Sequence, residues 1–286
     1  MDTEYDKLMQ MMKAVEDGKV AEVKKWLAAG VSPNERHYFM RELEGNGEVM
    51  DALRMAMLED MAEEAGKDIT DYWVTPLLSA IMTKQKVAMV KLLVEAGGDV
   101  NLADDEGVTP LMHSDCSAVT ELLLQRGADV HARDCGGRTA LLYARTAGQV
   151  RLLLAAGADP NAVDKTGNTA LMCVPDAEIA GLLLAAGVDV NHRNATGMTA
   201  LLLAESPDVA KALLAAGADE TACDAEGNNA LHVAAILQNK EQVRFWARRG
   251  MPPDAVNEEG LTAIDLAEEA GNEGIAKILC AAARSK

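Results

Sequence analysis

Thr139-Ala140-Leu141-Leu142-Tyr143 contains a short sequence motif that recurs along the chain at a fixed interval. The motif is Thr-Ala-Leu or a close variant, and its five central copies begin at Thr109, Thr139, Thr169, Thr199 and Asn229, each 30 residues after the last. Flanking copies begin at Thr75 and Thr262, at distances of 34 and 33 residues. A fixed period of this length is typical of a solenoid, in which each unit packs only on its neighbours. The sequence therefore predicts stacked repeats rather than two globular domains.

The unit that begins at Thr139 predicts two short helices followed by a hairpin. The run Ala140–Ala144 predicts the first helix, which the Thr139 hydroxyl is expected to cap by accepting a backbone N–H. A second helix is predicted over Gln149–Ala156, and Gly157 ends it because a left-handed residue commonly follows a helix. The next, turn-rich stretch reverses at Asp164–Gly167.

Four phrases of one unit carry a resemblance to a known family. They are Thr109-Pro110-Leu111, Leu122-Leu123-Leu124, Gly127-Ala128-Asp129-Val130-His131 and Asp134-Cys135-Gly136-Gly137. This order resembles the ankyrin repeat, over Trp73–Cys280 and more loosely over Leu8–Asn34. The resemblance implies an all-α solenoid of stacked helix-turn-helix units with projecting β-hairpin loops. It also implies non-catalytic binding of proteins through the hairpin tips and the exposed side of the inner helices.

The central repeats are three residues shorter than the usual ankyrin repeat of about 33 residues. The shortening falls between the two helices. After Thr199, the second helix is expected to begin at Ser206-Pro207-Asp208, a cap followed by proline at the first helical position. The inner helix is then little more than one turn, and the groove that it lines should be shallow.

The positions of the histidines differ from those in the ankyrin repeat. The histidine that follows Thr-Pro-Leu in the family occurs only at His232, so apolar packing is expected to replace its hydrogen bond elsewhere. The replacing residues are Leu78, Met112, Leu142, Met172 and Leu202. His131 and His192, at or next to the Asn position before the hairpin, are expected to bond the backbone.

The repeats also predict the domain organisation. Residues 1–34 form an N-terminal capping repeat, 73–260 the ankyrin repeats, and 261–286 a C-terminal capping repeat. Residues 35–72 are either a helical insertion or a degenerate repeat. Within them Glu48–Glu64 predicts one amphipathic helix with a methionine-rich face, for which packing on the first repeats is favoured over contact with a partner.

Composition limits the classes of partner and of location. The formal net charge is −18, which argues against nucleic acid, because phosphate binding needs Lys and Arg, and against anionic membranes. No apolar stretch approaches the ~20 residues of a membrane span, and no signal peptide is visible. Five cysteines with no CxxC spacing favour reduced thiols and a cytoplasmic protein. Aromatic residues are 3% of the chain, so an aliphatic core is expected. The expected oligomeric state is a monomer.

The sequence lacks the common motifs that mark catalytic, phosphate-binding or metal-binding sites. The sequence contains no GxxxxGK loop, HExxH or GxSxG, and no Cys–His pairing at ligand spacing. The sequence therefore predicts a protein that is not an enzyme, with no cofactor and no metal.

The predicted hairpin tips differ in charge. The three central tips carry Arg133, Arg138, Lys165 and Arg193, and adjacent repeats should lie about 10 Å apart. The predicted partner-binding residues are these four cations with Asp105, Glu106, Asn168, Met198 and Glu226. The hypothesis is a basic strip with acidic flanks that meets a carboxylate-bearing segment; the alternative is that these charges only solvate exposed tips. Cations beside Cys135 favour its thiolate, so a reactive Cys135 is a further hypothesis.

Function is predicted at the level of a class. The first prediction is a non-catalytic scaffold that binds a partner protein through hairpin tips and inner helices. The alternative is an acidic inhibitor or immunity-type protein that neutralises a basic toxin or nuclease. A fold does not by itself identify a partner.

Overall fold

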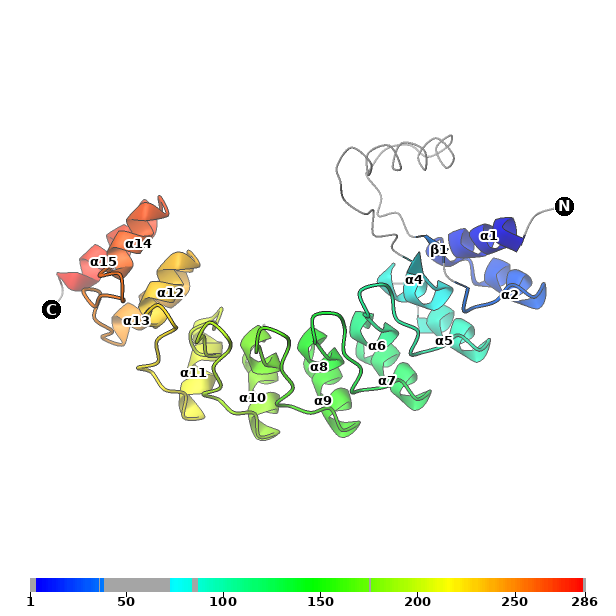
Figure 1. Ribbon diagram of the computed structural model, residues 1–286, viewed down its shortest axis with the longest axis horizontal. Helices are drawn as coiled ribbons and strands as arrows, with labels where there is room; N and C mark the ends of the chain where they lie inside the picture. The colour runs from blue at the N-terminus through cyan, green and yellow to red at the C-terminus, as the bar shows by residue number, and fades with distance from the viewer. Residues whose placement is uncertain (1–3, 36, 39–72, 84–86, 175, 285–286) are drawn as a thin grey trace. The chain divides into compact units, whose positions relative to one another are not determined.

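The computed structural model describes residues 4–35, 37–38, 73–83, 87–174 and 176–284. The chain divides into two compact units, Met1–Asp129 and Val130–Lys286. Each unit is built from short antiparallel helix pairs joined by loops (Figure 1). The predicted all-α repeat architecture is confirmed.

In unit 1 the first helix pair packs directly on the second. The described elements are α1 (Glu4–Glu16), α2 (Val20–Ala28), β1 (His37–Tyr38), β2 (Trp73–Val74), α4 (Pro76–Met82), α5 (Val87–Glu95), α6 (Pro110–His113) and α7 (Ser117–Gln125). Helix α1 contacts α4, and α2 contacts α5. The side chain of Asn34 joins the two pairs, because it donates to the carbonyl of Gly97 at 3.0 Å and accepts the amide of Asp99 at 2.7 Å.

Strands β1 and β2 form a two-stranded antiparallel sheet, so residues 38 and 73 lie opposite each other. The predicted helix Glu48–Glu64 lies outside the described residues. The interpretation of residues 35–72 as an insertion or a degenerate repeat therefore stays a hypothesis, as do the two capping repeats.

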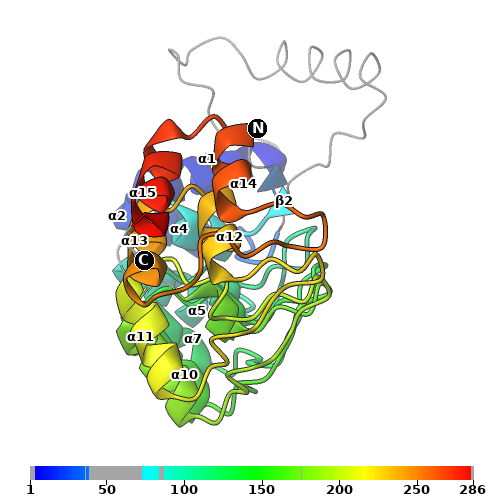
Figure 2. The same ribbon diagram turned by 90° about the vertical axis from the view of Figure 1, so that its left-hand side faces the viewer.

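Unit 2 contains an inner row of short helices and an outer row of longer ones. Its described elements are α8 (Ala140–Tyr143), α9 (Ala147–Ala155), η1 (Ala170–Cys173), α10 (Ala177–Ala185), α11 (Pro207–Ala215), α12 (Ala230–Ile236), α13 (Lys240–Arg248), α14 (Ala263–Glu269) and α15 (Glu273–Ala283). Neighbouring outer helices contact each other from α9 through α10, α11 and α13 to α15. The hairpins of this unit lie side by side on the edge away from the outer helices (Figure 2).

The inner helices of the 30-residue repeats are shortened as predicted. Helices α8 and η1 have four residues each, whereas α12 and α14 have seven. After Thr199 the chain forms only a turn before α11. Helix α11 begins at Pro207, and the Ser206 side chain caps it by accepting the amide of Val209. The missing three residues thus remove about one turn from the inner helix.

The predicted capping role of the Thr139 hydroxyl is wrong. Thr139 occupies the N-cap position of α8, but its side chain makes no capping bond, and its buried oxygen has no hydrogen-bond partner among the described residues. The amide of Leu142 instead donates to the backbone carbonyl of Thr139 at 3.0 Å. In a helix of one turn, this tight backbone bond already satisfies the amide that the hydroxyl would have capped.

The core is aliphatic, as expected from the composition, with one large exception. Leu123, Leu153 and Leu183 are fully buried at equivalent positions of successive outer helices, and Trp246 of α13 is 1% exposed. The residues that replace the family histidine are all buried, which confirms apolar packing there: Leu78, Met112, Leu142, Met172 and Leu202.

His232 is buried, and both of its ring nitrogens face oxygen atoms. Its ring nitrogens lie 2.8 Å from Asn229 Oδ1 and 3.1 Å from the carbonyl oxygen of Ala255. Burial lowers the pKa of His232 below its usual 6.5, although hydrogen bonds to the carbonyls of Leu261 and Ala255 oppose the shift.

We expect His232→Leu to flatten the pH dependence of stability. Below about pH 6.5 the unfolded chain binds a proton at His232 that the folded protein does not, so folding loses stability as the pH falls. For the wild type this loss is at most about 1.4 kcal/mol per pH unit from this group. Urea unfolding from about pH 7.5 to about pH 5.5 measures the slope. Parallel curves for the two proteins would contradict the assignment.

Candidate functional site

The hairpins of unit 2 are closed by one Asp or Asn each. Asp134, Asp164, Asn194, Asp224 and Asn257 occupy the equivalent turn position, and each side-chain oxygen accepts the backbone amides two and four residues later at 2.8–3.1 Å. Such Asx turns hold a tight reversal without secondary structure. We refer to the five turns, residues 134–138, 164–168, 194–198, 224–228 and 257–261, as the tip row.

Backbone hydrogen bonds join each turn of the tip row to the next. Lys165 N–H donates to Gly136 O at 2.8 Å, Ala195 N–H to Thr166 O at 2.9 Å, and Glu258 N–H to Glu226 O at 2.9 Å. Side-chain amides add two links, from Asn194 to Asn168 at 2.8 Å and from Asn257 to Asn228 at 2.9 Å. The tips are therefore connected along the row and not five independent loops.

Two of the predicted cations brace neighbouring hairpins. Arg133 Nη1 donates to Gly137 O at 2.8 Å and to Val163 O at 2.7 Å, and Arg193 Nη2 donates to Cys223 O. Each arginine thus bonds the carbonyl 30 residues later, which is the equivalent position of the next repeat. Both side chains belong to exposed residues, so their positive charges face solvent while their bonds stabilise the row.

Arg138 is engaged differently, because it faces a buried carboxylate. Its Nε donates to Asp134 Oδ2 at 2.7 Å, and its guanidinium lies 4.7 Å from the ring centroid of Tyr143. The Tyr143 hydroxyl donates to the same oxygen at 2.7 Å. Burial alone would raise the pKa of Asp134, but the hydrogen bonds from Tyr143 and Arg138 outweigh it and lower the pKa.

Lys165 is exposed and forms no ion pair among the described residues. Asn168, by contrast, is largely occupied within the row: its amide donates to Asp164 Oδ2 and Thr166 Oγ1, and its oxygen accepts from Asn194. Met198 is half-buried, and exposed Glu226 accepts a bond from the Asn228 amide at 3.2 Å. The tip row therefore contains five of the predicted site residues, Arg138, Lys165, Asn168, Met198 and Glu226, and Arg133 and Arg193 directly precede its first and third turns.

The remaining predicted residues, Asp105 and Glu106, are exposed on a hairpin of unit 1. There the turn residue Asp104 accepts the amide of Glu106 at 3.0 Å. Cys135 is exposed on the first turn of the tip row, and its reactivity stays a prediction. His192 bonds the carbonyl of Gly167 at 2.9 Å, which confirms its expected backbone contact.

The sequence prediction missed the contact between inner helices and turn carboxylates. Tyr143 bonds Asp134, and His113 Nε2 lies 3.1 Å from Asp104 Oδ2, in both cases nine residues after the turn residue. The signal was present as a side chain with a hydrogen-bond donor at the same position of two successive repeats. These contacts couple the last residue of the inner helix to the tip.

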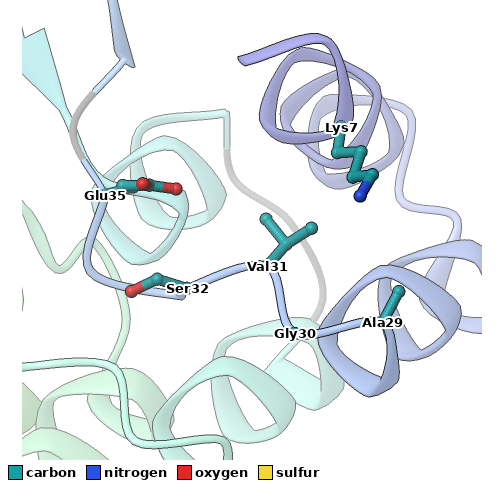
Figure 3. Close-up of a pocket in the computed structure, with 6 residues that line it drawn as sticks. All are labelled: Lys7, Ala29, Gly30, Val31, Ser32 and Glu35. Atoms are coloured by element: carbon teal, nitrogen blue, oxygen red, sulfur yellow. The ribbon is translucent and has the colours of Figure 1, made fainter. Parts of the chain in front are cut away.

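A small polar pocket lies in unit 1, between α1 and the loop that follows α2 (Figure 3). Lys7 borders it on one side, and Ser32 and Glu35 border it on the other. Its volume of about 90 Å³ is far below the roughly 300–1,000 Å³ of sites for small organic ligands. The described residues contain no group of three or more His, Cys, Asp or Glu placed to hold a metal ion.

Among the described helices, none combines the length and the apolar character needed to cross a bilayer.

Comparison with known proteins agrees with the geometry of helix pairs and hairpins. The model of the family "Ankyrin repeats (3 copies)" matches residues 11–134, 114–194, 144–222, 173–245 and 198–286, which overlap and together cover most of the chain. No curated protein matches the chain significantly. The repeating helix pair, the Asx-closed hairpin and the family match together show that the chain belongs to the ankyrin-repeat family.

Proposed function

We propose that this protein is a non-catalytic scaffold that binds a partner protein through the tip row and the adjoining inner helices. Ankyrin repeats are in general protein–protein interaction modules and typically non-catalytic. The observation that carries the proposal is the hydrogen-bonded connection of successive tips. A surface that is already ordered loses little conformational entropy on binding.

The partner segment is proposed to be acidic. Arg133, Lys165 and Arg193 project from consecutive hairpins, and stacked repeats lie roughly 10 Å apart. Their charges are exposed, whereas that of Arg138 faces Asp134. We also propose a cytoplasmic location, supported by five cysteines with no CxxC spacing, as is usual for reduced thiols.

We expect the triple variant Arg133→Glu, Lys165→Glu, Arg193→Glu to lose its partner in an affinity capture from lysate of the source cells. Arg138 is left unchanged because its reversal would disturb buried Asp134. A matched control reverses Arg151, Lys211 and Lys277, each of which forms a surface ion pair on an outer helix. It changes the net charge equally.

Loss of one protein from the tip variant, with retention by the control, supports the proposal. The expected affinity loss is about tenfold or more. Equal capture by all three baits would overturn the tip row as the binding surface. Equal loss from both variants would indicate a response to net charge, which fits the second candidate function.

The second candidate function is an acidic inhibitor of a basic protein, favoured by the net charge of −18. Such a complex should be tight, of 1:1 stoichiometry and strongly salt-dependent, because long-range attraction is screened by ions. Titration of the captured protein at low and high ionic strength separates this function from a scaffold with modest, salt-tolerant affinities.

A further inference from the structure

Helix α13 is firmly anchored on one side. Asn239 caps it by accepting the amide of Gln242 at 3.1 Å, and the Gln242 side chain donates to Ala204 O at 2.6 Å. Gln242, Val243 and Trp246 are buried. The helix contacts α11, α12 and α15 within unit 2, so its opposite side is held in a defined position.

That opposite side carries a stripe of cations. Lys240, Arg244 and Arg248 are exposed and follow one another at intervals of four residues, which places them along one helix face. The stripe is about 12 Å long, from the helical rise per residue. The exposed residues of α13 comprise the cations Lys240, Arg244 and Arg248 and the carboxylate Glu241, a net charge of +2 in a chain whose net charge is −18.

The cations of the neighbouring outer helices are neutralised, but those of the stripe are not. Arg151 pairs with Glu178 at 2.6 Å, Lys211 with Asp208 at 2.9 Å, and Lys277 with Glu273 at 2.9 Å. Arg249, just after α13, pairs with Glu220 at 2.8 Å. In the described part of the chain, Lys240, Arg244 and Arg248 have no such pair, so their charges remain available to an external group.

An aromatic side chain lies beside the stripe. Phe245 is half-buried, with its ring centroid 4.8 Å from that of Trp246 in an edge-on arrangement. The Arg249 guanidinium lies 5.7 Å from the Phe245 centroid. Aromatic residues and arginine are the residue types enriched in protein–protein interfaces.

We propose that the exposed side of α13, formed by Lys240, Arg244, Phe245 and Arg248, is a second protein-binding surface that takes a short acidic segment of a partner protein. We call it the α13 patch. Carboxylates of the segment pair with Arg244 and Arg248, and an apolar side chain packs on Phe245. Nucleic acids and anionic membranes fit less well, because they extend beyond a stripe of about 12 Å and meet the acidic remainder of the chain. Helix α13, which carries the patch, lies among the outer helices, on the other side of unit 2 from the hairpins (Figure 2). Binding at the α13 patch can therefore be tested independently of the proposed function.

The test uses the full chain and a fluorescent poly-glutamate peptide of about eight residues, which spans the stripe even when only partly extended. Fluorescence anisotropy at about 0.15 M salt, where the Debye length is about 8 Å, measures its affinity. The variant Arg244→Glu, Arg248→Glu removes the proposed contacts, and Lys211→Glu, Lys277→Glu is the matched control with the same charge change on flanking helices. The triple tip variant reports on the other basic surface. Circular dichroism establishes that each variant is folded.

The proposal predicts that Arg244→Glu, Arg248→Glu binds the peptide at least about tenfold more weakly than wild type. The matched control and the tip variant should stay within about twofold, since surface charges act mainly at short range. Undetectable binding by the wild type, or equal weakening in both double variants, would overturn it. So would tighter binding, through the same residues, of phosphatidylserine vesicles or of single-stranded DNA.

Discussion

Asp134→Ala is expected to lower the free energy of unfolding by about 3 kcal/mol, because each buried donor that loses its acceptor costs about 1–3 kcal/mol. The Asp134 side chain is 0% exposed and accepts bonds from Arg138 Nε and the Tyr143 hydroxyl. It also accepts the amides of Gly136 and Arg138 that close the turn. Alanine removes all four acceptor contacts, and the donors cannot all recover water without opening the hairpin.

Urea unfolding followed by circular dichroism measures the effect, with two controls. Asp134→Asn keeps an acceptor for the turn amides, as Asn194 does in the native chain, and should be intermediate. Tyr143→Phe removes only one donor and should cost about 1 kcal/mol. If alanine were tolerated as well as asparagine, the turn would be held by backbone geometry alone.

The same carboxylate gives the expected behaviour in acid. The pKa of Asp134 is lowered in the folded protein relative to 3.8. Its contribution to stability is therefore fully present above 3.8 and is lost as the pH falls through the folded value. The stability difference between wild type and Asp134→Asn should shrink in that acid range and stay constant near neutral pH.

Gly197→Ala is the second change with a large expected effect. Gly197 has φ of +76°, and a Cβ there would lie 2.8 Å from Ala225 N and 3.1 Å from the carbonyl carbon of Asp224. These are backbone atoms of the next hairpin, and the same Ala225 amide donates to Thr196 O. The substitution should therefore add overpacking, of order 1–3 kcal/mol, to the strain of a left-handed alanine, about 1 kcal/mol.

Gly217→Ala is the matched control for this contact. Gly217 also has a positive φ, +93°, but a Cβ there meets no atom within 4 Å. It should cost only the backbone strain, about 1 kcal/mol. The difference in the urea midpoint between the two variants measures how closely successive tips pack. Equal midpoints would show that the row relaxes freely around the new methyl group.

Much of the fold could be predicted from local signals. In the central units, the distance from the Thr that opens the repeat to the cap of the second helix is three residues shorter, which is enough to predict inner helices of one turn. Ser206 and Pro207 also predicted the start of α11 correctly. The Thr139 cap is absent because the Leu142 amide donates to the backbone carbonyl of Thr139 and not to its hydroxyl.

The candidate site was predicted in position but not in its bonding. The sequence prediction treated the four tip cations alike, yet Arg138 faces a buried carboxylate, Arg133 and Arg193 brace neighbouring hairpins, and Lys165 forms no ion pair among the described residues. The acceptors of Arg133 and Arg193 lie 30 residues further on. Only the distance between stacked repeats decides whether such a bond can form.

The sequence by itself determined the repeat, its helix pairs and its turns, because these depend on residues within a few positions of each other: periodic leucines, caps, and glycines with positive φ. The tertiary structure decided which charged side chains form ion pairs or hydrogen bonds within the protein and which face solvent. That outcome depends on contacts between residues about 30 positions apart, such as Arg249 with Glu220. Stacking brings these residues together, and the same stacking leaves Lys165 and the α13 patch without ion pairs in the described part of the chain.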